Sequence, residues 1–450
     1  MYYSGVFICR NGEVDMFSKI LVANRGEIAV RIIRACKEMG INTVAVYSEA
    51  DRQALHVALA DESYCIGKSE SKESYLQEER IISAAMISGA QAIHPGYGFL
   101  SENAHFAALC RKNGIVFIGP TAEMMDELSD KSVIKKKMEE AGLSVIPGTA
   151  ALDSVDEAFA AAEKIGYPVM LKACAGGGGR GIRLVQTASE MANAFAQATA
   201  EGEASFGDGS VYMEKYVFPA RHIEVQIMAD EAGNVVCLGE RDCSLQRSHQ
   251  KLIEESPSPN VKESSRKKLI KDSIEALKKI DYVGVGTLEF LMDDEGNFWF
   301  MEMNIRLQVE HCVTEMLTKI DLVKWQIRIA AGIPISFKQE DVNLSGSAIE
   351  CRVMAQAPGK LNMLHVPGGP FVRFDTYLVP GTEVTPYYDA LLGKLIVSAG
   401  TREESLRKLK AALCELVIDG IPTNIEKQLR LIEDERFMKG QYDLSFVGSR

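Results

Sequence analysis

The segment LKACAGGGGRGIR, residues 171–183, decides how the middle of this chain is interpreted. Consecutive glycines occur in flexible linkers, dinucleotide fingerprints and phosphate-binding loops, so the tract alone leaves these alternatives open. Strand-like residues flank it, YPVMLKAC before and GIRLVQ after. A P-loop would instead open a helix through GK[ST], which is absent here. We expect a strand–loop–strand hairpin whose backbone N–H groups fold over phosphates, with Lys172 adding a positive charge.

A second hairpin is predicted downstream, in VGTLEFLMDDEGNFWFMEMN, with its turn near Asp294–Asn297. Glu289 lies on its first strand, and Glu302 and Asn304 share a face of the second because their spacing is two. Like charges on paired strands are unfavourable without a cation between them. The alternative is a solvated acidic edge, which fits poorly with the surrounding aromatic residues. These three oxygen donors therefore predict a Mg²⁺ site beside a triphosphate.

The residues after this hairpin continue the alternation of polar and apolar positions. Arg306, Gln308 and Glu310 are expected along one line, giving a cation, an amide and an acid. Such a row can hold a small anion through Arg306 and remove its proton through Glu310. A plain ion pair between Arg306 and Glu310, without chemistry, is the alternative.

Two further groups of polar residues adjoin predicted strands. In ERDCSLQRSHQK, Gln246, His249 and Lys251 lie close together and suit ribose or anion binding, although a lone histidine is more often structural. In MEKYV, Glu214 and Lys215 end a strand and could edge a purine ring. Surface Glu-Lys pairs are ordinary, so MEKYV alone carries no signal.

The first hundred residues alternate strand-like and helical segments. KILVAN, NTVAVYS, QAIHPG and IVFIGP are strand-like, and helical runs such as RGEIAVRIIRACKEMG separate them. This order predicts a doubly wound parallel sheet. The turn NRGE after the first strand is not GxGxxG, so the dinucleotide fingerprint is absent there. In IHPGYGFLSEN we expect His94, Tyr97 and Ser101 to be exposed at a strand end, where such sheets bind ligands.

Composition restricts the broad class of protein. The chain has 450 residues, a net charge of −12 and 46% hydrophobic residues, which predicts two to four domains and argues against general nucleic-acid binding. No apolar run approaches 20 residues, so no membrane span is expected. Ten cysteines are scattered without a CxxC pair. This pattern favours a reduced, cytoplasmic setting over a disulfide framework or a structural zinc site.

Several blocks together resemble the biotin carboxylase family of ATP-grasp enzymes. They are ILVANRGEIAVRIIRA, AIHPGYGFLSEN, KACAGGGGRGI, MEKYV, ARHIEVQI, ERDCSLQRSHQK, FMEMNIRLQVEH and PYYDALLGKLI, in order from about Met16 almost to the C-terminus. The resemblance implies that MgATP phosphorylates bicarbonate to carboxyphosphate, after which the carboxyl group moves to N1 of biotin on a carrier protein. Positioning and cations, rather than a protein nucleophile, suffice for such phosphoryl transfer.

The resemblance also implies roles for individual residues. Those implied to bind ATP are Lys131, Lys172, Gly176, Gly177, Gly178, Gly179, Glu214, Lys215, His222, Gln246 and His249. Those implied to hold Mg²⁺, or Mn²⁺, are Glu289, Glu302 and Asn304. Those implied to seat bicarbonate are Lys251, Arg306, Gln308 and the Val309 backbone, with Glu310 as general base. Arg352 would stabilise the biotin enolate and Tyr97 would pack beside the biotin ring.

The domain organisation implied by the family has four parts. They are an N-terminal extension 1–15, expected to be disordered, an N-terminal domain 16–129, an ATP-grasp domain 130–337 with a mobile lid 146–218, and a mixed α+β C-terminal domain 344–450. Since no AMKM-like biotinylation site occurs, we expect a separate biotin carboxyl carrier protein. A carboxyltransferase of acetyl-CoA carboxylase, acting in fatty acid synthesis, and a homodimer are the other expected partners.

The sequence departs from the family pattern in three places. After Arg352 the chain reads MAQAPGKLNM, where the family usually has an acidic NAEDP-like segment and a longer loop. Ala175 replaces the first glycine of the tract, and Ile305 replaces a smaller residue. Two alternatives follow: another ATP-grasp ligase, or a nucleotide-binding paralogue with an impaired biotin half-reaction.

Overall fold

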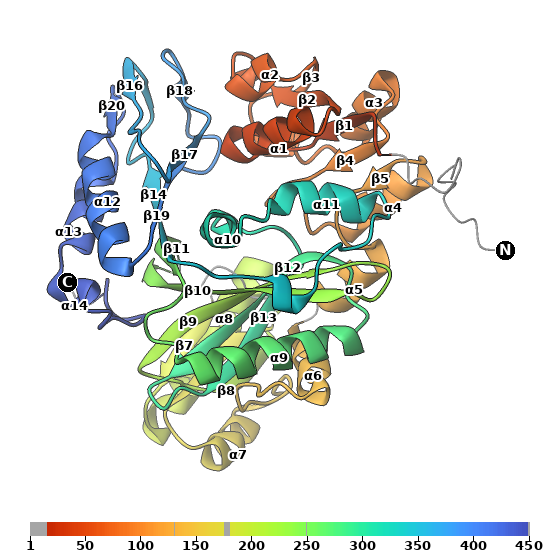
Figure 1. Ribbon diagram of the computed structural model, residues 1–450. Coiled ribbons are helices and arrows are strands. Elements are labelled where there is room, and N and C mark those ends of the chain that lie inside the picture. Colours follow the sequence, from red (N-terminus) through yellow and green to blue (C-terminus); the bar gives the residue numbers. More distant parts are fainter. Residues whose placement is uncertain (1–15, 130, 175–180, 249, 449–450) are drawn as a thin grey trace.

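The computed structural model describes residues 16–129, 131–174, 181–248 and 250–448 (Figure 1). The side chains of Lys131, Ser132 and Phe206 are not among the described parts. The predictions made for residues 1–15, for Ala175 and Gly176–Gly179, for His249 and for the Lys131 side chain therefore lie outside the described residues.

The first part of the chain folds into a parallel sheet, as predicted, with its strand order reversing about β1. In sheet order the strands are β3 (Glu62–Gly67), β2 (Asn42–Ser48), β1 (Lys19–Val22), β4 (Ala92–His94) and β5 (Val116–Phe117). The helices of this part are α1 (Gly26–Glu38), α2 (Leu55–Leu59), α3 (Glu78–Ser88), α4 (Ala104–Lys112) and α5 (Ala122–Ser129). Such a doubly wound sheet opens a crevice at the carboxyl ends of β1 and β4.

A small separate sheet carries the strands that flank the glycine tract. Its order is β7 (Ile182–Val185), β6 (Val169–Ala173) and β8 (Val211–Lys215), all antiparallel. The pairing of β6 with β7 confirms the predicted strand–loop–strand hairpin. Helices α7 (Val155–Ile165) and α8 (Met191–Phe206) pack on this sheet and share an apolar core with it. In Figure 1 this unit, which we call the lid, lies at the bottom of the molecule.

An eight-stranded antiparallel sheet forms the centre of the molecule. Its order is β13 (Phe298–Asn304), β12 (Gly284–Asp293), β9 (Ala220–Ala229), β10 (Val235–Arg247), β11 (Gln250–Ser256), β14 (Ser347–Met354), β19 (Leu391–Ala399) and β17 (Val372–Thr376). The last three strands come from the predicted C-terminal domain, so one sheet runs across the predicted boundary at residue 344. Sequence analysis did not anticipate this continuity.

Helices cover both faces of the central sheet. Alternate residues of β9 separate the two faces: Ile223, Val225 and Ile227 pack in one core with helices α6 (Lys131–Ala141) and α9 (Glu263–Lys279). Met228 packs in another core with helix α11 (Leu322–Ala330) and the N-terminal helix α1. This alternation follows from the two-residue period of a strand.

The C-terminal part adds its own helices and small strands beside β14 and β19, sharing one large apolar core. The helices are α12 (Arg402–Glu415), α13 (Ile425–Ile432) and α14 (Glu435–Met438). The small antiparallel pairs are β15 (Gly359–Lys360) with β18 (Glu383–Val384), and β16 (Met363–His365) with β20 (Val417–Asp419). The remaining elements are α10 (His311–Thr318), η1 (Glu49–Asp51), η2 (Ser71–Glu73), η3 (Ala188–Glu190) and η4 (Gln339–Asp341).

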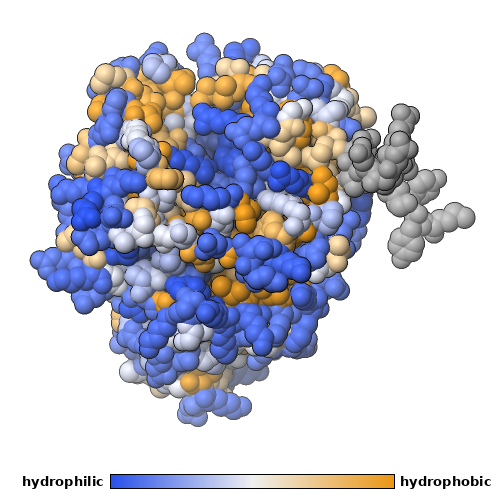
Figure 2. Space-filling model, viewed as in Figure 1, coloured by the Kyte–Doolittle hydropathy of each residue, from blue (hydrophilic) through white to orange (hydrophobic). Residues whose placement is uncertain are grey.

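The surface is mixed in character. Figure 2 shows a face on which hydrophilic residues predominate and hydrophobic residues form small scattered groups, as on most globular proteins. Within the described ranges no helix combines the length and apolar character that crossing a membrane would require.

Candidate active site

A cavity of about 1120 Å³ lies where the N-terminal sheet, the lid and the central sheet meet. All residues to which the family resemblance gave a role, and whose side chains are described, line it: Tyr97, Lys172, Glu214, Lys215, His222, Gln246, Lys251, Glu289, Glu302, Asn304, Arg306, Gln308, Val309, Glu310 and Arg352. Pockets for one drug-sized ligand usually span about 300–1,000 Å³. This cavity therefore has room for a nucleotide together with a second, smaller substrate.

The predicted metal-binding hairpin forms as β12 and β13. Glu289 stands directly opposite Glu302 in the register, and Thr287 stands opposite Asn304. Glu289 is 5% exposed, and burial alone would raise its pKa, but the charges of Lys251 and His222 outweigh burial and lower it. Glu289 is therefore a carboxylate at neutral pH, which a metal ligand must be.

The donor set of this hairpin fits Mg²⁺ or Mn²⁺. Glu289, Glu302 and Asn304 offer hard oxygen atoms from neighbouring positions that all line the cavity. Nitrogen donors occupy Glu289 in this structure: Asn304 Nδ2 and Gln308 Nε2 each donate to its Oε1 at 2.7 Å. A cation bound here would take over part of this coordination.

The prediction that Arg306, Gln308 and Glu310 continue the alternation of a strand after β13 is wrong. The strand ends at Asn304, and residues 305–310 form an irregular segment whose apolar members, Ile305 and Leu307, are buried in the core. The side chains of this segment are held by tertiary contacts that a local pattern cannot reveal. The alternative of an Arg306–Glu310 ion pair does not form either, because Arg306 binds Glu102 at 3.0 Å and Glu310 binds other cations.

Lys251 is the cationic centre of the cavity floor. Its ammonium group contacts three carboxylates: Glu224, Glu289 at 3.4 Å and Glu310 at 2.7 Å. Burial would lower the pKa of Lys251, but Glu289 and Glu310 raise it above its usual value. Lys251 is therefore charged and lies among three acids. An anion can bind only at the groups on the outer side of this cluster, which line the cavity.

Glu310 is held from both sides. Lys251 binds its Oε1 at 2.7 Å, and Arg352 binds its Oε2 at 2.9 Å. Burial would raise the pKa of Glu310, yet the two cations lower it well below its usual value. Arg352 also donates to Glu254 at 2.6 Å. The carboxylate is thus ionised and fixed in orientation, as a proton acceptor must be.

The lid contributes a second ion-pair cluster to the cavity. Glu214 on β8 binds Lys172 on β6 at 2.5 Å and Lys135 on α6 at 2.9 Å. Burial would raise the pKa of Glu214, but the two lysines lower it. Lys215 instead donates to the carbonyl oxygens of Gly166, at 2.8 Å, and Tyr167. Lys172 and Glu214 of this cluster line the cavity, whereas Lys135 does not.

Gln246 and His222 meet across two neighbouring interior strands of the central sheet, β10 and β9. Gln246 Nε2 lies 2.8 Å from His222 Nδ1, and the other ring nitrogen lies 3.0 Å from Glu289. Gln246 also stands opposite Lys251 in the β10–β11 pairing. Gln246 and Lys251 therefore belong to the strands β10 and β11, and not to a segment adjoining a strand as predicted.

The residues that follow strand β4 of the N-terminal sheet differ from the prediction in one respect. His94 and Ser101 are buried, not exposed, and only Tyr97 of the three lines the cavity. Burial lowers the pKa of His94 to about 3, so its ring is neutral, and its Nδ1 accepts from Gly96 N. The hydroxyl of Tyr97 donates to Glu27, the first-turn acid of α1.

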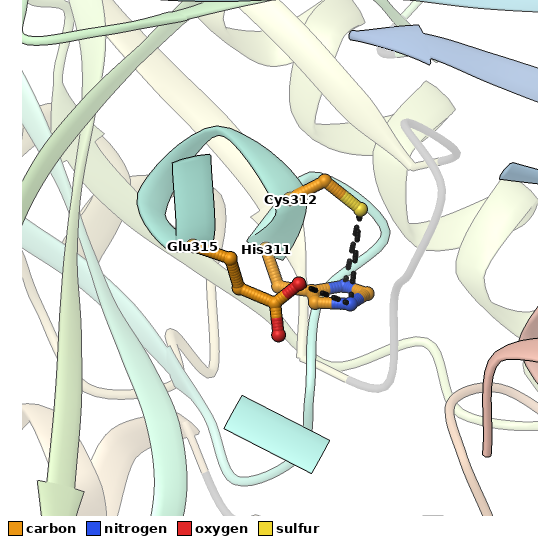
Figure 3. Close-up of side chains that lie close together, drawn as sticks. All are labelled: His311, Cys312 and Glu315. Carbon is orange, nitrogen blue, oxygen red and sulfur yellow. Dashed lines mark hydrogen bonds and ion pairs between the residues drawn. The ribbon is translucent and has the colours of Figure 1, made fainter. Parts of the chain in front are cut away.

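Helix α10 begins directly after Glu310 with three potential metal ligands, His311, Cys312 and Glu315 (Figure 3). Glu315 is already paired with Arg31 and Arg373, each at 2.8 Å. A divalent cation would face these two guanidinium groups at short range, which is unfavourable. We interpret this cluster as a set of structural contacts that hold the start of α10 beside the active site, and not as a metal centre.

Several residues of the site were missed by sequence analysis. They are Glu27, Lys135, Glu224, Arg241, Glu254, His311 and Lys394. A signal existed for one of them, because His222, Glu224 and Gln226 follow each other at spacing two on β9. The others depend on contacts between distant elements. For example, Arg241, fully buried, donates to Glu224 at 3.0 Å and to Thr314 on α10 at 3.0 Å.

Family models match three consecutive parts of the chain. The biotin carboxylase N-terminal domain matches residues 16–125, the ATP-binding domain of the carbamoyl-phosphate synthase L chain matches 130–338, and the biotin carboxylase C-terminal domain matches 350–449. The chain is also 48% identical over 442 residues to Biotin carboxylase 1 of Bacillus subtilis (strain 168), covering 96% of this chain and 98% of that protein.

Solved structures agree over the same span. The biotin carboxylase–beta-gamma-ATP complex from Campylobacter jejuni superimposes with a TM-score of 0.93 at 48% identity, covering 96% of this chain and 99% of that one. The biotin carboxylase domain dimer of Hydrogenobacter thermophilus 2-oxoglutarate carboxylase, in complex with MgADP, ADP and bicarbonate, gives 0.92 at 45% identity, covering 97% and 98%. Both the fold and the sequence are therefore similar to those of these biotin carboxylases along almost the whole chain.

Proposed function

This chain belongs to the biotin carboxylase family, and we propose that it carboxylates biotin at the expense of ATP and bicarbonate. The observation that carries the proposal is the single cavity in which Glu310, two cations and the Glu289/Glu302 hairpin face the lid. This combination supplies a base, an anion-binding group and a site for metal and phosphate within one cavity.

The first step is phosphoryl transfer to bicarbonate. Glu310 accepts the bicarbonate proton while Lys251 and Arg306 offset the negative charge of the anion. A bicarbonate oxygen then forms a bond to the γ-phosphorus of ATP, the bond to the β-phosphate oxygen breaks, and ADP leaves. Lys172 compensates the charge on the phosphates from the lid side. When bound at Glu289, Glu302 and Asn304, Mg²⁺ neutralises further phosphate charge.

The second step moves the carboxyl group to biotin. The mixed anhydride releases its carboxyl group to N1 of biotin, and the phosphate formed takes the N1 proton. Arg352 stabilises charge on the biotin ureido oxygen, and Tyr97, which also lines the cavity, packs beside the biotin ring. Met354, in the altered segment after Arg352, also lines the cavity, so the substituted loop adjoins this side.

We propose a homodimer that works with a biotin carboxyl carrier protein, as expected from the family and from the dimer named for the Hydrogenobacter thermophilus domain. We further propose a carboxyltransferase partner that passes the carboxyl group to acetyl-CoA in fatty acid synthesis. A reducing, cytoplasmic location is proposed because the nine described cysteines are all free.

The test is the dependence of ADP release on each substrate. With MgATP, we expect release to require bicarbonate and to increase when free biotin is added. Stimulation by bicarbonate without carboxylation of biotin would point to an impaired second step. Indifference to both would contradict the proposal and favour another ATP-grasp ligase.

The metal hairpin is tested by Glu302→Gln, with Glu295→Gln on the exposed turn of the same hairpin as its control. Loss of one charged ligand should raise the Mg²⁺ or Mn²⁺ concentration for half-maximal turnover by about tenfold or more. The control should leave it unchanged. Normal metal dependence in Glu302→Gln would contradict the assignment.

A further inference from the structure

The segment that carries Gln308, Val309 and Glu310 is neither helix nor strand. It contains one backbone turn bond, from His311 N to the Gln308 carbonyl oxygen at 3.3 Å, so side-chain contacts also determine its backbone orientation. Its side chains are anchored: Gln308 donates to Glu289, and Glu310 is held by Lys251 and Arg352. Its backbone is anchored as well, by two buried side chains outside the catalytic set.

His311 holds the peptide group before Val309. Its Nδ1 lies 2.8 Å from the carbonyl oxygen of Gln308, which can only accept, so Nδ1 carries the proton. The ring is fully buried, and burial lowers its pKa to about 3, which keeps it neutral. Figure 3 shows the ring beside Cys312 and Glu315, with its other nitrogen 3.7 Å from the Cys312 sulfur.

Lys394 holds the peptide group after Val309. Its Nζ donates to the Val309 carbonyl oxygen at 3.0 Å and pairs with Glu27 at 3.1 Å. The lysine is fully buried on β19, opposite Arg352 in the register. Since Glu27 also accepts from Tyr97, Lys394 connects the central sheet to both sides of the cavity.

The two contacts fix where the Val309 N–H points. The Gln308–Val309 peptide is trans, so the N–H of Val309 is directed away from the Gln308 carbonyl that His311 holds. Among the described residues none accepts a hydrogen bond from this N–H, and Val309 lines the cavity. A backbone donor is thus left unused at the anion seat.

We propose that His311 and Lys394 form a peptide clamp, orienting the two peptide groups on either side of Val309 so that its N–H binds the bicarbonate. Both are positioning residues, since neither lines the cavity itself. A fully buried lysine is costly unless its partners compensate it. We therefore explain the contact of Lys394 with the Val309 carbonyl by the orientation that it gives this peptide group, and not by a contribution to the stability of the fold. The inference rests on the proposed function, because the anion is bicarbonate.

The test compares substitutions at the clamp with matched controls. Lys394→Met and His311→Leu remove the donors, whereas Lys267→Met and His365→Leu change exposed residues of the same types. We expect the KM for bicarbonate to rise about tenfold or more in the clamp variants, as for a misoriented donor. The KM for ATP should stay within about twofold, because the lid and hairpin are untouched. The controls should behave like the unmodified enzyme.

Rescue distinguishes orientation from a purely structural role. In His311→Asn the amide nitrogen occupies the place of Nδ1, whereas His311→Gln places it near the other ring nitrogen. We expect Asn, but not Gln, to restore the bicarbonate KM, and this comparison decides the question if Lys394→Met fails to fold. An unchanged bicarbonate KM, or a parallel rise in both KM values, would contradict the clamp in an active enzyme. Absence of bicarbonate-dependent turnover in the unmodified protein would instead overturn the proposed function and the identity of the anion.

Discussion

At the scale of single residues, Glu310 is the base that we propose for the first step, and its surroundings decide what it can do. Lys251 and Arg352 bind one carboxylate oxygen each and lower its pKa. Glu310 is therefore ionised at neutral pH, and its role depends on position more than on a pKa tuned to neutrality. Substrate must displace part of this ion pairing before a proton can be transferred.

Replacing Glu310 by Gln removes the base and leaves its size nearly unchanged. We expect turnover to fall on the order of a hundredfold or more, while the KM for ATP stays near that of the unmodified enzyme because the lid is untouched. Steady-state ADP release measures both. Unchanged turnover would refute the role of Glu310.

The residue types of the site could be predicted from sequence, but their contacts could not. The pairing of Glu289 with Glu302 followed from a turn and a two-residue period, which are local signals. The orientation of Arg306 and Glu310 did not follow, because β13 ends at Asn304 and long-range contacts take over. Lys394 was not identified at all, since it is 85 residues from Val309 along the chain.

At the scale of elements, strands β11 and β14 place two buried acids side by side. Glu254 and Glu350 are register partners, and both are fully buried. Glu254 is bonded to Arg352, whereas both oxygens of Glu350 and the second oxygen of Glu254 have no partner among the described residues. A proton on Glu350 would give two of these three oxygens a hydrogen bond between the carboxyl groups. Burial is the main cause that raises the pKa of Glu350.

The groups facing Glu350 decide the sign of its pH effect. Lys394 on β19 and Arg352 on β14 lower its pKa, while burial, Glu254 on β11 and Glu310 before α10 raise it, with a net rise. With a raised folded-state pKa, stability is fully present below the unfolded pKa of about 4.3 and is lost as pH rises through the folded pKa.

Glu350→Gln should therefore keep the fold and reduce the loss of stability with rising pH. Gln is neutral at every pH and can donate to Glu254. Denaturant unfolding between pH 5 and 9 measures it, with Glu340→Gln on the surface segment η4 as the control. Identical pH dependence in Glu350→Gln and the unmodified protein would show that Glu350 is not protonated.

At the scale of the whole molecule, the site exists only where three parts meet. The N-terminal domain supplies Tyr97, the lid supplies Lys172, Glu214 and Lys215, the central sheet supplies the other strand residues, and the irregular segment 305–310 supplies Arg306, Gln308, Val309 and Glu310. The parallel sheet and the hairpins were predictable because consecutive elements pair. The continuation of the central sheet through β14, β19 and β17 was not, since β11 and β14 are about ninety residues apart and their pairing leaves no local signal.

Three buried histidines make the whole fold sensitive to acid. Burial lowers the pKa of His56 to about 4 and those of His94 and His311 to about 3. Since these values are below the unfolded value of about 6.5, stability is present above that pH and is lost as pH falls toward the folded pKa. Each histidine contributes a slope of about 1.4 kcal/mol per pH unit.

Replacing His94 by Asn should therefore reduce the acid slope by about 1.4 kcal/mol per pH unit between roughly pH 6 and 4. Urea unfolding at a series of pH values gives the slope. His105→Asn, at a side chain that is 79% exposed, is the control and should not change it. Equal slopes in His94→Asn and the control would contradict the buried, neutral state of His94.

The most direct measurement of the central claim is transfer of labelled carbon from bicarbonate to free biotin. With MgATP present, the account predicts that the label appears on N1 of biotin, that one ADP is formed for each carboxybiotin, and that omission of ATP abolishes the label. ATP hydrolysis without any labelled carboxybiotin, under conditions in which bicarbonate and biotin are saturating, would contradict it.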